Sequence, residues 1–231
     1  MNYDTLLDES FDFLYPNKAV IDYCINLMNY DQYHKIDGFN WWLDPRKPLT
    51  IWEGGEPRPI KIIKIHGSVN WKYCNCCNQV LLTPWNSKID IKSNTFKGTI
   101  GASDENHEEI QYDLRCPNDG SLFDTFIVPP SHIKDLKHPA INRLFDEAAI
   151  ELRKAKKIIF VGYSFPEADV HIKAFFKKNI TKEIEIEVVD PFLSQQAENN
   201  YRSLSKSVTF VKDFFENYID TRMREKLKTN A

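Results

Sequence analysis

Four of the five cysteines in this sequence lie where they could bind a metal ion. Cys74, Cys76 and Cys77 share one short segment. Cys116 opens the segment Cys-Pro-Asn-Asp-Gly, in which Asp119 stands where a second cysteine would complete a pair. Tetrahedral Zn²⁺ prefers thiolates and imidazoles but accepts a carboxylate oxygen. The spacing therefore predicts a zinc site with the ligands Cys74, Cys77, Cys116 and Asp119. Because four protein ligands leave no open coordination position, such a site would be structural.

Two features leave the ligand set open. Cys76 or His107 could replace one of the predicted ligands. The interval between Cys77 and Cys116 also exceeds the roughly 15–20 residues that usually separate the cysteine pairs of a zinc ribbon. A remnant that no longer binds metal is therefore the alternative to a working zinc site.

A further candidate for chemistry is a histidine that follows a predicted strand. Segment 60–65 is rich in β-branched residues, and we expect a strand that ends at His66, beside a flexible Gly67. An imidazole in that place could act as a base near neutral pH. A purely structural histidine is the alternative.

Residues that follow two later strands could contact a nucleotide. Gly162 and Ser164 come after the apolar run 158–161, and Asp190 comes after the run 184–189. Ligands of open α/β sheets collect beyond the carboxyl ends of the strands, so Gly162 could approach a phosphate and Asp190 could accept a ribose hydroxyl. The alternative is structural, with Gly162 in a tight turn, Ser164 capping the next helix and Asp190 in an Asp-Pro turn.

The overall composition excludes several classes of protein. Hydrophobic residues make up 42% of the 231 residues, which is enough apolar material for a folded core. The formal net charge is −3 and no long basic run occurs, so we expect no binding to nucleic acid or to a membrane surface. The chain shows no secretory signal pattern and no run of about 18 apolar residues, which predicts a cytoplasmic protein.

The elements that must position these residues can be read from the hydrophobic spacing. Apolar residues recur at helical spacing in 17–29, whereas the tryptophan-rich stretch 30–59 has no clean period and predicts a long ordered loop. Short β-like runs at 80–82 and 110–114 indicate an inserted subdomain.

The remainder of the chain predicts an α/β fold. Strands alternate there with helices, which is typical of a parallel sheet covered on both faces. Because run 158–161 is continuously apolar while run 184–189 alternates, we expect the first strand to be central and the second to lie nearer an edge. The expected elements are helix 138–155, strand 157–161, helix 168–178, strand 183–189, helix 193–204, strand 208–211 and helix 214–226.

The order of these motifs resembles the SIR2-like (sirtuin-like) family. Asn2-Tyr3-Asp4, the strand with His66-Gly67-Ser68, the cysteine cluster and Gly162-Tyr163-Ser164 follow one another as they do in that family. A four-ligand zinc module is inserted there directly after the His-Gly. The segments NYDTLL, KIHGSVNW, IVPPSHIK and GYSFPEADVHI look most like the bacterial SIR2-like proteins linked to phage defence.

The resemblance implies roles for particular residues. Asn2 and His66 resemble the catalytic residues of the family. The positions that match its NAD contacts are Asp4, Gly162, Ser164 and Asp190. The implied chemistry is cleavage of the nicotinamide–ribose bond, either as NAD hydrolysis or as NAD-dependent deacylation, with NAD and Zn²⁺ as cofactors.

The sequence departs from the family before Asn2. The first strand and the glycine-rich loop that cradles the pyrophosphate in the family have no counterpart in this sequence. Backbone N–H groups of that loop neutralise the pyrophosphate, so we expect weak or absent NAD turnover by this chain alone. The alternative to an enzyme is an inactive remnant or an interaction module that needs another segment, a partner protein or a second copy.

The expected architecture is therefore α/β, with one small insertion. A Rossmann-like parallel sheet with helices on both faces, incomplete at the N-terminus, would be formed by residues 1–67 and 126–231. A zinc-ribbon-like module would occupy residues 68–125.

Overall fold

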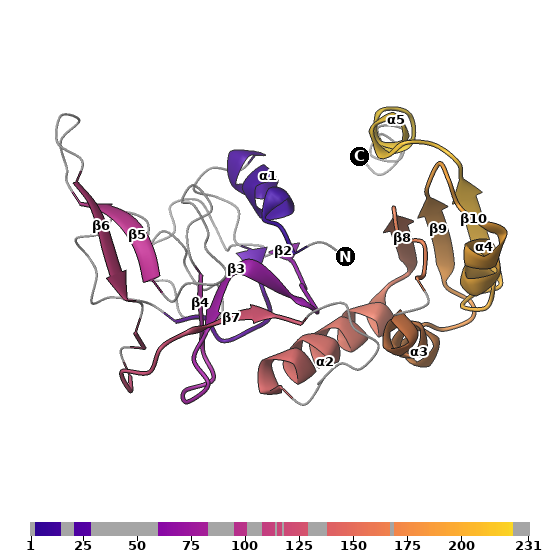
Figure 1. The fold of residues 1–231 in the computed structure, drawn as a ribbon. Coiled ribbons are helices and arrows are strands. Elements are labelled where there is room, and N and C mark those ends of the chain that lie inside the picture. The colour runs from indigo at the N-terminus through magenta and orange to yellow at the C-terminus, as the bar shows by residue number, and fades with distance from the viewer. Residues whose placement is uncertain are drawn as a thin grey trace, which may run out of the picture. The chain divides into compact units, whose positions relative to one another are not determined.

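The structure is a computed structural model of a chain that forms two compact units (Figure 1). The first unit comprises Met1–Pro129 and Asp135–Phe145, and the second comprises Pro130–Lys134 and Asp146–Ala231. Helix α2 (Pro139–Lys154) contributes residues to both. The structure describes residues 3–14, 21–28, 60–82, 95–100, 108–113, 115–116, 118–128, 138–166 and 169–223.

The first unit is built around strand β3 (Gly67–Tyr73). This strand lies between β4 (Val80–Leu82) and β7 (Asp124–Ile127) and is antiparallel to both (Figure 1). The other elements of the unit are helix α1 (Leu6–Leu14), the parallel pair β1 (Ile21–Asp22) and β2 (Ile60–Lys61), and the antiparallel pair β5 (Thr95–Ile100) and β6 (Glu108–Asp113).

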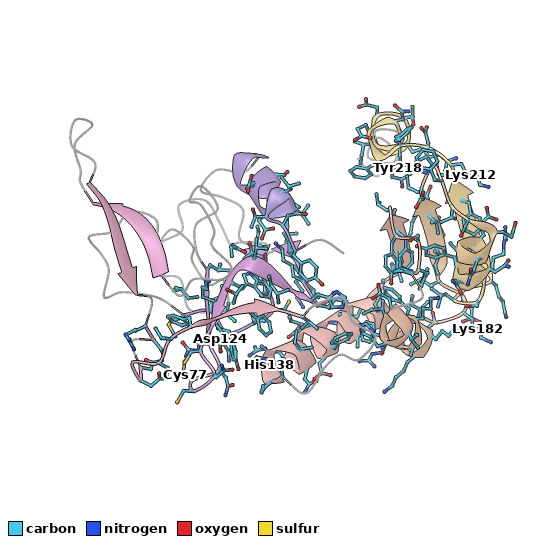
Figure 2. The ribbon with its side chains drawn as sticks, in the orientation of Figure 1. Cys77, Asp124, His138, Lys182, Lys212 and Tyr218 are labelled. Carbon is cyan, nitrogen blue, oxygen red and sulfur yellow. The ribbon has the colours of Figure 1, made fainter. Side chains whose placement is uncertain are left out.

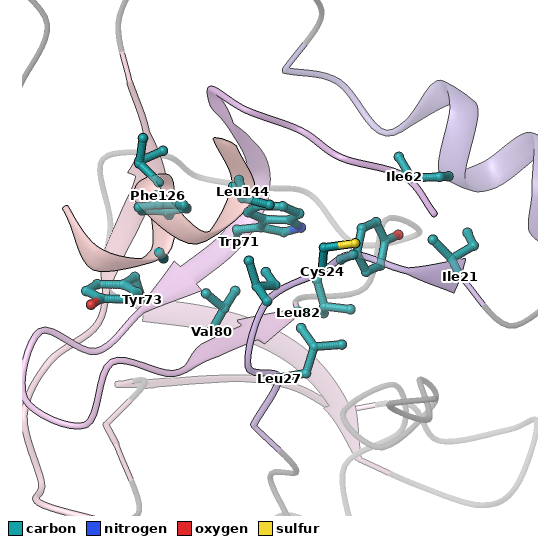
Figure 3. Close-up of a cluster of buried hydrophobic side chains, with 14 residues drawn as sticks. Ile21, Cys24, Leu27, Ile62, Trp71, Tyr73, Val80, Leu82, Phe126 and Leu144 are labelled. Carbon is teal, nitrogen blue, oxygen red and sulfur yellow. The ribbon is translucent and has the colours of Figure 1, made fainter. Parts of the chain in front are cut away.

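Strand β3 supplies the centre of the first hydrophobic core, shown in Figure 3. The Trp71 side chain is fully buried, with the Tyr23 ring edge-on at 5.6 Å and the Phe126 ring stacked at 6.1 Å between centroids. Leu144 of helix α2 packs into the same cluster. Because an aromatic side chain buries roughly 150–250 Å², these rings provide much of the apolar burial that holds the small sheet together.

The second unit is a parallel sheet with helices between its strands. Its strands β8 (Lys157–Val161), β9 (Glu185–Val189) and β10 (Ser207–Val211) lie in the order β10-β9-β8. The helices are α3 (Val170–Asn179), α4 (Gln195–Arg202) and α5 (Phe215–Tyr218), which continues into the π-helical turn Ile219–Met223. The predicted α/β class and parallel sheet are confirmed, while the Rossmann-like topology stays a prediction.

The strand order contradicts one expectation. Strand β9, with its alternating sequence, is the middle strand, and β8 has one neighbour among the strands that the structure describes. Glu187 of β9 is buried, with its carboxylate 2.7 Å from Lys157 Nζ and 2.9 Å from an Arg222 guanidinium nitrogen. Ile159 and Val161 of β8 are instead 38% and 43% exposed. The prediction failed because an alternating sequence does not show that a charged residue such as Glu187 is neutralised by cations from other elements.

The helix predicted for 17–29 is wrong over the residues that the structure describes. Ile21–Asp22 form β1, and Cys24 follows with a φ of 62° that no helix contains. The Asp22 carboxylate accepts the Cys24 N–H at 2.8 Å and closes a turn. All residues of this segment except Asn26 are buried, so the spacing of its apolar residues does not distinguish a helix from a strand. The loop predicted for 30–59 lies outside the described residues.

Within the described ranges, no helix is both long and apolar enough to cross a bilayer.

Candidate metal centre

Two turns lie at the same end of the β4-β3-β7 sheet. The first knuckle (residues 74–79) connects β3 to β4, and the second knuckle (residues 116–121, with 117 outside the described set) precedes β7. Tyr73, the last residue of β3, pairs with Val80 on one side and with Asp124 on the other. This shared pairing places both knuckles beyond the same end of β3.

The first knuckle is closed by two backbone hydrogen bonds. The Cys74 N–H donates to the Gln79 carbonyl at 3.0 Å, and the Asn78 N–H donates to the Cys74 carbonyl at 3.0 Å. Asn78 adopts a φ of 56°, in the left-handed region that asparagine tolerates better than most residues. The Cys77 N–H points to Cys74 Sγ at 3.5 Å. The turn thus presents the two sulfur atoms on one side.

The second knuckle repeats this pattern position for position. The Cys116 N–H donates to the Ser121 carbonyl at 2.8 Å, and the Gly120 N–H donates to the Cys116 carbonyl at 2.8 Å. Gly120 has a φ of 74° and corresponds to the asparagine of the first knuckle. Asp119 Oδ1 accepts the Ser121 N–H at 2.8 Å. Asp119 therefore occupies the position that the second cysteine holds in the first knuckle.

The four predicted ligands come together at one point. One ligand atom from each of Cys74, Cys77, Cys116 and Asp119 lies within 4.8 Å of all the others. Cys77 Sγ is 3.7 Å from Cys116 Sγ, and Cys74 Sγ is 3.2 Å from Asp119 Oδ2. Two sulfurs at about 2.3 Å from a tetrahedral Zn²⁺ are roughly 3.8 Å apart. The sulfur pair thus already has the spacing that zinc requires.

The pKa shifts differ among the four residues of the cluster, and burial raises the pKa of the Cys74 thiol. Burial raises the pKa of the Cys116 thiol to about 12. Burial also raises the pKa of Cys77, but hydrogen bonds led by the Gln79 N–H outweigh it and hold that pKa below its ordinary value. Hydrogen bonds from Ser121 lower the pKa of Asp119, so this carboxylate stays charged. A bound metal would displace the remaining thiol protons, because the thiolate is the ligand form.

Neighbouring side chains hold the knuckles against the sheet. The Asn75 side chain of the first knuckle donates to the Asp124 carboxylate at the start of β7. Tyr73 packs with its ring centroid 4.2 Å from that of His138, whose Nδ1 accepts the Ala140 N–H at the start of helix α2. Figure 2 labels Cys77, Asp124 and His138 in this region. These contacts join the first knuckle to β7 and join the end of β3 to the start of helix α2.

His66 occupies a place other than the predicted one. The preceding strand β2 ends at Lys61, and His66 lies in the turn directly before β3. Its side chain is 6% exposed, and its ring stacks on Tyr3 at 6.3 Å. Gly67 has a φ of 80°, and a Cβ there would lie 1.9 Å from the Phe126 carbonyl oxygen. Gly67 is therefore required by the close approach of β7 to β3.

The N-terminal candidates can be placed only in part. Asn2 lies outside the described residues. Asp4 Oδ1 accepts the Leu6 N–H at 3.2 Å, at the start of helix α1, and its carbonyl accepts the Lys64 ammonium at 2.8 Å. The Tyr3 carbonyl accepts the Val69 N–H of β3 at 2.9 Å. The segment before α1 is thereby joined to the beginning of β3.

The remaining candidates lie at the carboxyl edge of the parallel sheet. Val161 pairs with Val189, so Gly162 and Asp190 follow neighbouring strands, and the Gly162 N–H donates to the Val189 carbonyl at 3.0 Å. Asp190 Oδ1 accepts the Phe192 N–H at 2.8 Å and forms a turn. Ser164 is exposed and lies well before α3, whose N-cap is Asp169. Ser164 is therefore not a helix cap.

A buried ion pair in the first unit escaped the sequence reasoning. Lys64 Nζ lies 2.6 Å from Asp8 Oδ2, with the two side chains 8% and 0% exposed. Tyr23 donates its hydroxyl to Asp8 Oδ1, and Lys64 also donates to Ser68 Oγ at 3.1 Å. The network joins helix α1 to the turn before β3. The sequence could have indicated this pair, because the acidic Asp8 lies on the same face of helix α1 as Phe11.

Comparison with known proteins leaves the family open. No protein-family model matches the sequence, and no curated protein matches it. The SIR2-like resemblance therefore stays a prediction based on motif order.

Proposed function

We propose that this chain binds one Zn²⁺ at a structural site formed by the two knuckles. The ligands are Cys74, Cys77, Cys116 and Asp119. The observation that carries the proposal is the repetition of one turn geometry, which brings three sulfurs and one carboxylate oxygen within 4.8 Å of one another. Zinc accepts this set of donors in a tetrahedral site.

The proposed metal would crosslink a very small sheet. Strands β4 and β7 contain 3 and 4 residues, which is short for strands that must hold a sheet edge. A Zn²⁺ bound by both knuckles joins the β3–β4 hairpin to the residues before β7 and makes the module zinc-ribbon-like. In such modules the binding free energy of the metal is also folding free energy.

Metal analysis of the purified protein tests the proposal. We expect about one zinc per chain, retained through gel filtration and reduced strongly in Cys116→Ser. Cys24→Ser is the matched control, because Cys24 is a buried cysteine of the core whose Sγ lies 3.7 Å from the Asp22 carbonyl oxygen, outside the ligand set. Wild-type protein that binds neither Zn²⁺ nor Co²⁺ would contradict the proposal.

A second candidate function is nucleotide binding at the carboxyl edge of the parallel sheet. Gly162 favours it, because this residue has a φ of 59° and open space where a Cβ would lie, directly beside Asp190. A backbone of this kind permits close approach of a phosphate or ribose. By the SIR2-like resemblance the nucleotide is NAD, and Ser164 would add a contact at this edge. Asp4 is the further position that matches a NAD contact of that family.

Catalysis at the nicotinamide–ribose bond is the extension of this second proposal. Asn2 would orient water or the ribose and His66 would accept a proton, in NAD hydrolysis or in deacylation, with a role in phage defence. An inactive SIR2-like remnant or interaction module is the alternative.

Calorimetric titration with NAD separates these possibilities. We expect binding that weakens in Gly162→Val and is unchanged in Gly120→Ala, a control at another glycine with positive φ and open space around its Cβ position, in the first unit. Nicotinamide release that disappears in His66→Ala supports the enzyme. Binding without release at high protein concentration supports nucleotide binding without catalysis. No measurable binding removes the nucleotide-binding candidate and supports the inactive remnant or interaction module.

A further inference from the structure

Lys64 lies two residues before His66 and brings a charged group into the first unit, with its side chain only 8% exposed. A lysine ammonium has three hydrogen-bond donors. Lys64 Nζ lies 2.6 Å from Asp8 Oδ2, and it donates to the Asp4 carbonyl at 2.8 Å and to Ser68 Oγ at 3.1 Å. The three donors thus have three acceptors, which fixes the direction of the side chain.

Two of these acceptors hold the segment that contains the candidate residue Asp4. Ser68 Oγ, which accepts from Lys64, donates in turn to the Tyr3 carbonyl at 3.2 Å. The Val69 N–H donates to the same carbonyl at 2.9 Å. The carbonyls of two successive residues, Tyr3 and Asp4, are therefore bound by Lys64 and by the first residues of β3.

The backbone of Lys64 closes the turn that contains His66. The Gly67 N–H donates to the Lys64 carbonyl at 2.8 Å, and the Val128 N–H donates to the His66 carbonyl at 2.9 Å. The Tyr3 ring stacks on the His66 ring at 6.3 Å between centroids, and the Tyr3 hydroxyl donates to the Val128 carbonyl at 2.8 Å. The imidazole therefore lies against the segment that the Lys64 ammonium holds.

We propose that Lys64 is a positioning residue, which keeps Asp4 and His66 together as parts of one site. It acts through a backbone carbonyl and through the Tyr3 ring, and it needs no contact of its own with a ligand. This role rests on the second proposed function, in which Asp4 contacts NAD and His66 accepts a proton. Lys64 is then the residue on which the relative placement of the two depends.

Amide hydrogen exchange at single residues tests the proposal without NAD. Lys64→Met removes the ammonium and keeps most of the length of the side chain. We expect exchange at the Val69 N–H to accelerate by at least about tenfold relative to the Met28 N–H, because a hydrogen bond from a charged donor contributes roughly that factor. The Met28 N–H donates to the Val80 carbonyl at 2.8 Å and reports on the rest of the first unit.

A second buried lysine of the first unit supplies the matched control. Lys72 is 3% exposed, and its ammonium donates to Thr125 Oγ1 of β7 at 2.8 Å. Lys72→Met should therefore accelerate exchange at Val69 and Met28 to the same degree. An equal acceleration at both amides in Lys64→Met would mean that Lys64 only stabilises the fold, and it would overturn the proposal.

The NMR signals of the His66 ring give an independent readout. The ring current of Tyr3 shifts these signals while the two rings stack, so Tyr3→Leu defines their unstacked position. We expect Lys64→Met to move the His66 signals toward that position and Lys72→Met to leave them in place. His66 signals that stay at their wild-type positions in Lys64→Met contradict the proposal.

A milder variant covers the case in which Lys64→Met does not fold, since loss of one partner of a buried ion pair is strongly destabilising. Ser68→Ala removes the hydroxyl between Lys64 and the Tyr3 carbonyl and leaves the ion pair in place. We expect faster exchange at Val69 and a shifted His66 signal, both smaller than in Lys64→Met. No change in either readout would count against the proposal.

Failure of the proposed function is seen in a different measurement. If NAD does not bind, the nucleotide-binding candidate is removed, yet hydrogen exchange and NMR still decide whether Lys64 holds Asp4 and His66 together. If nicotinamide is released, Lys64→Met should lower the rate of release and Lys72→Met should leave it unchanged.

Discussion

Each unit has a largely buried central strand, β3 in the first and β9 in the second. The two strands differ in the length of their neighbours and in the side chains that they bury. Strand β3 is buried along almost its whole length by aromatic and aliphatic side chains, yet its neighbours are very short. Strand β9 has neighbours of 5 residues on both sides and tolerates a buried glutamate in its middle. The proposed zinc would add a crosslink to the small antiparallel sheet, whereas the parallel sheet has no candidate metal group among the residues that the structure describes.

Removal of metal should give the largest difference between the units. Structural zinc contributes an apparent binding free energy on the order of 10 kcal/mol, so a chelator should abolish amide hydrogen-exchange protection in β3, β4 and β7. Protection in β9 and β10 should change little. The comparison fails if both units lose protection together, or if neither does.

Substitution of Gly67 should come next. Gly67→Ala adds a Cβ that meets the Phe126 carbonyl oxygen at 1.9 Å. We expect a loss of about 3 kcal/mol or more in unfolding free energy, because a clash between β3 and β7 adds to the roughly 1–2 kcal/mol of left-handed backbone strain.

Gly162→Ala is the matched control in the second unit. It has a similar φ but open space around the new Cβ, so it should cost only about 1–2 kcal/mol. Equal losses in chemical denaturation would show that the close approach at Gly67 is unimportant.

Removal of the buried glutamate should affect the second unit. Glu187→Ala leaves Lys157 and Arg222 without their shared carboxylate. We expect a loss of about 2–3 kcal/mol, below the ~3–5 kcal/mol of a fully buried pair, because both cations reach solvent. Urea denaturation followed by hydrogen exchange measures the effect and locates it.

An exposed ion pair provides the control for Glu187. Glu183 and Lys206 are 3.8 Å apart, with both side chains more than 70% exposed. Glu183→Ala should therefore change stability by less than about 1 kcal/mol. A comparable loss in both variants would mean that burial of Glu187 has no energetic consequence.

The smallest predicted effect concerns one helix cap of the second unit. Ser194 Oγ accepts the Ala197 N–H at 3.2 Å at the start of helix α4. Ser194→Ala should cost about 1 kcal/mol, measured as a shift of the denaturation midpoint. Ser203→Ala at the other end of this helix should be nearly neutral, since its hydroxyl bonds only an exposed carbonyl.

Much of the second unit could be predicted from local patterns. Strand 157–161 has the predicted bounds, and helix 138–155 is observed as Pro139–Lys154. These elements were accessible because their apolar spacing matches one structural period over many residues. The order of the strands could not be predicted from local patterns. Such patterns do not show that Lys157 and Arg222, which lie in other elements, neutralise the buried Glu187.

Less of the first unit could be predicted from local sequence patterns. Nearly all of segment 21–28 is buried, so its apolar spacing suggested a helix that does not form. Strand β2 is shorter than predicted, and His66 consequently lies in a turn before β3. The conformation of short strands in an aromatic core depends on contacts with residues that are distant in the sequence, so a short stretch of sequence does not predict it.

For the candidate metal centre, what the sequence predicted can be separated from what only the tertiary structure decided. The sequence by itself predicted the donors Cys74, Cys77, Cys116 and Asp119 from two short segments of equal length, and it left Cys76 or His107 as possible replacements. Only the tertiary structure decided that these turns meet, since β3 pairs on one side with β4 and on the other with β7. That pairing, set by packing around Trp71, brings distant ligands to the separation that a single metal ion requires.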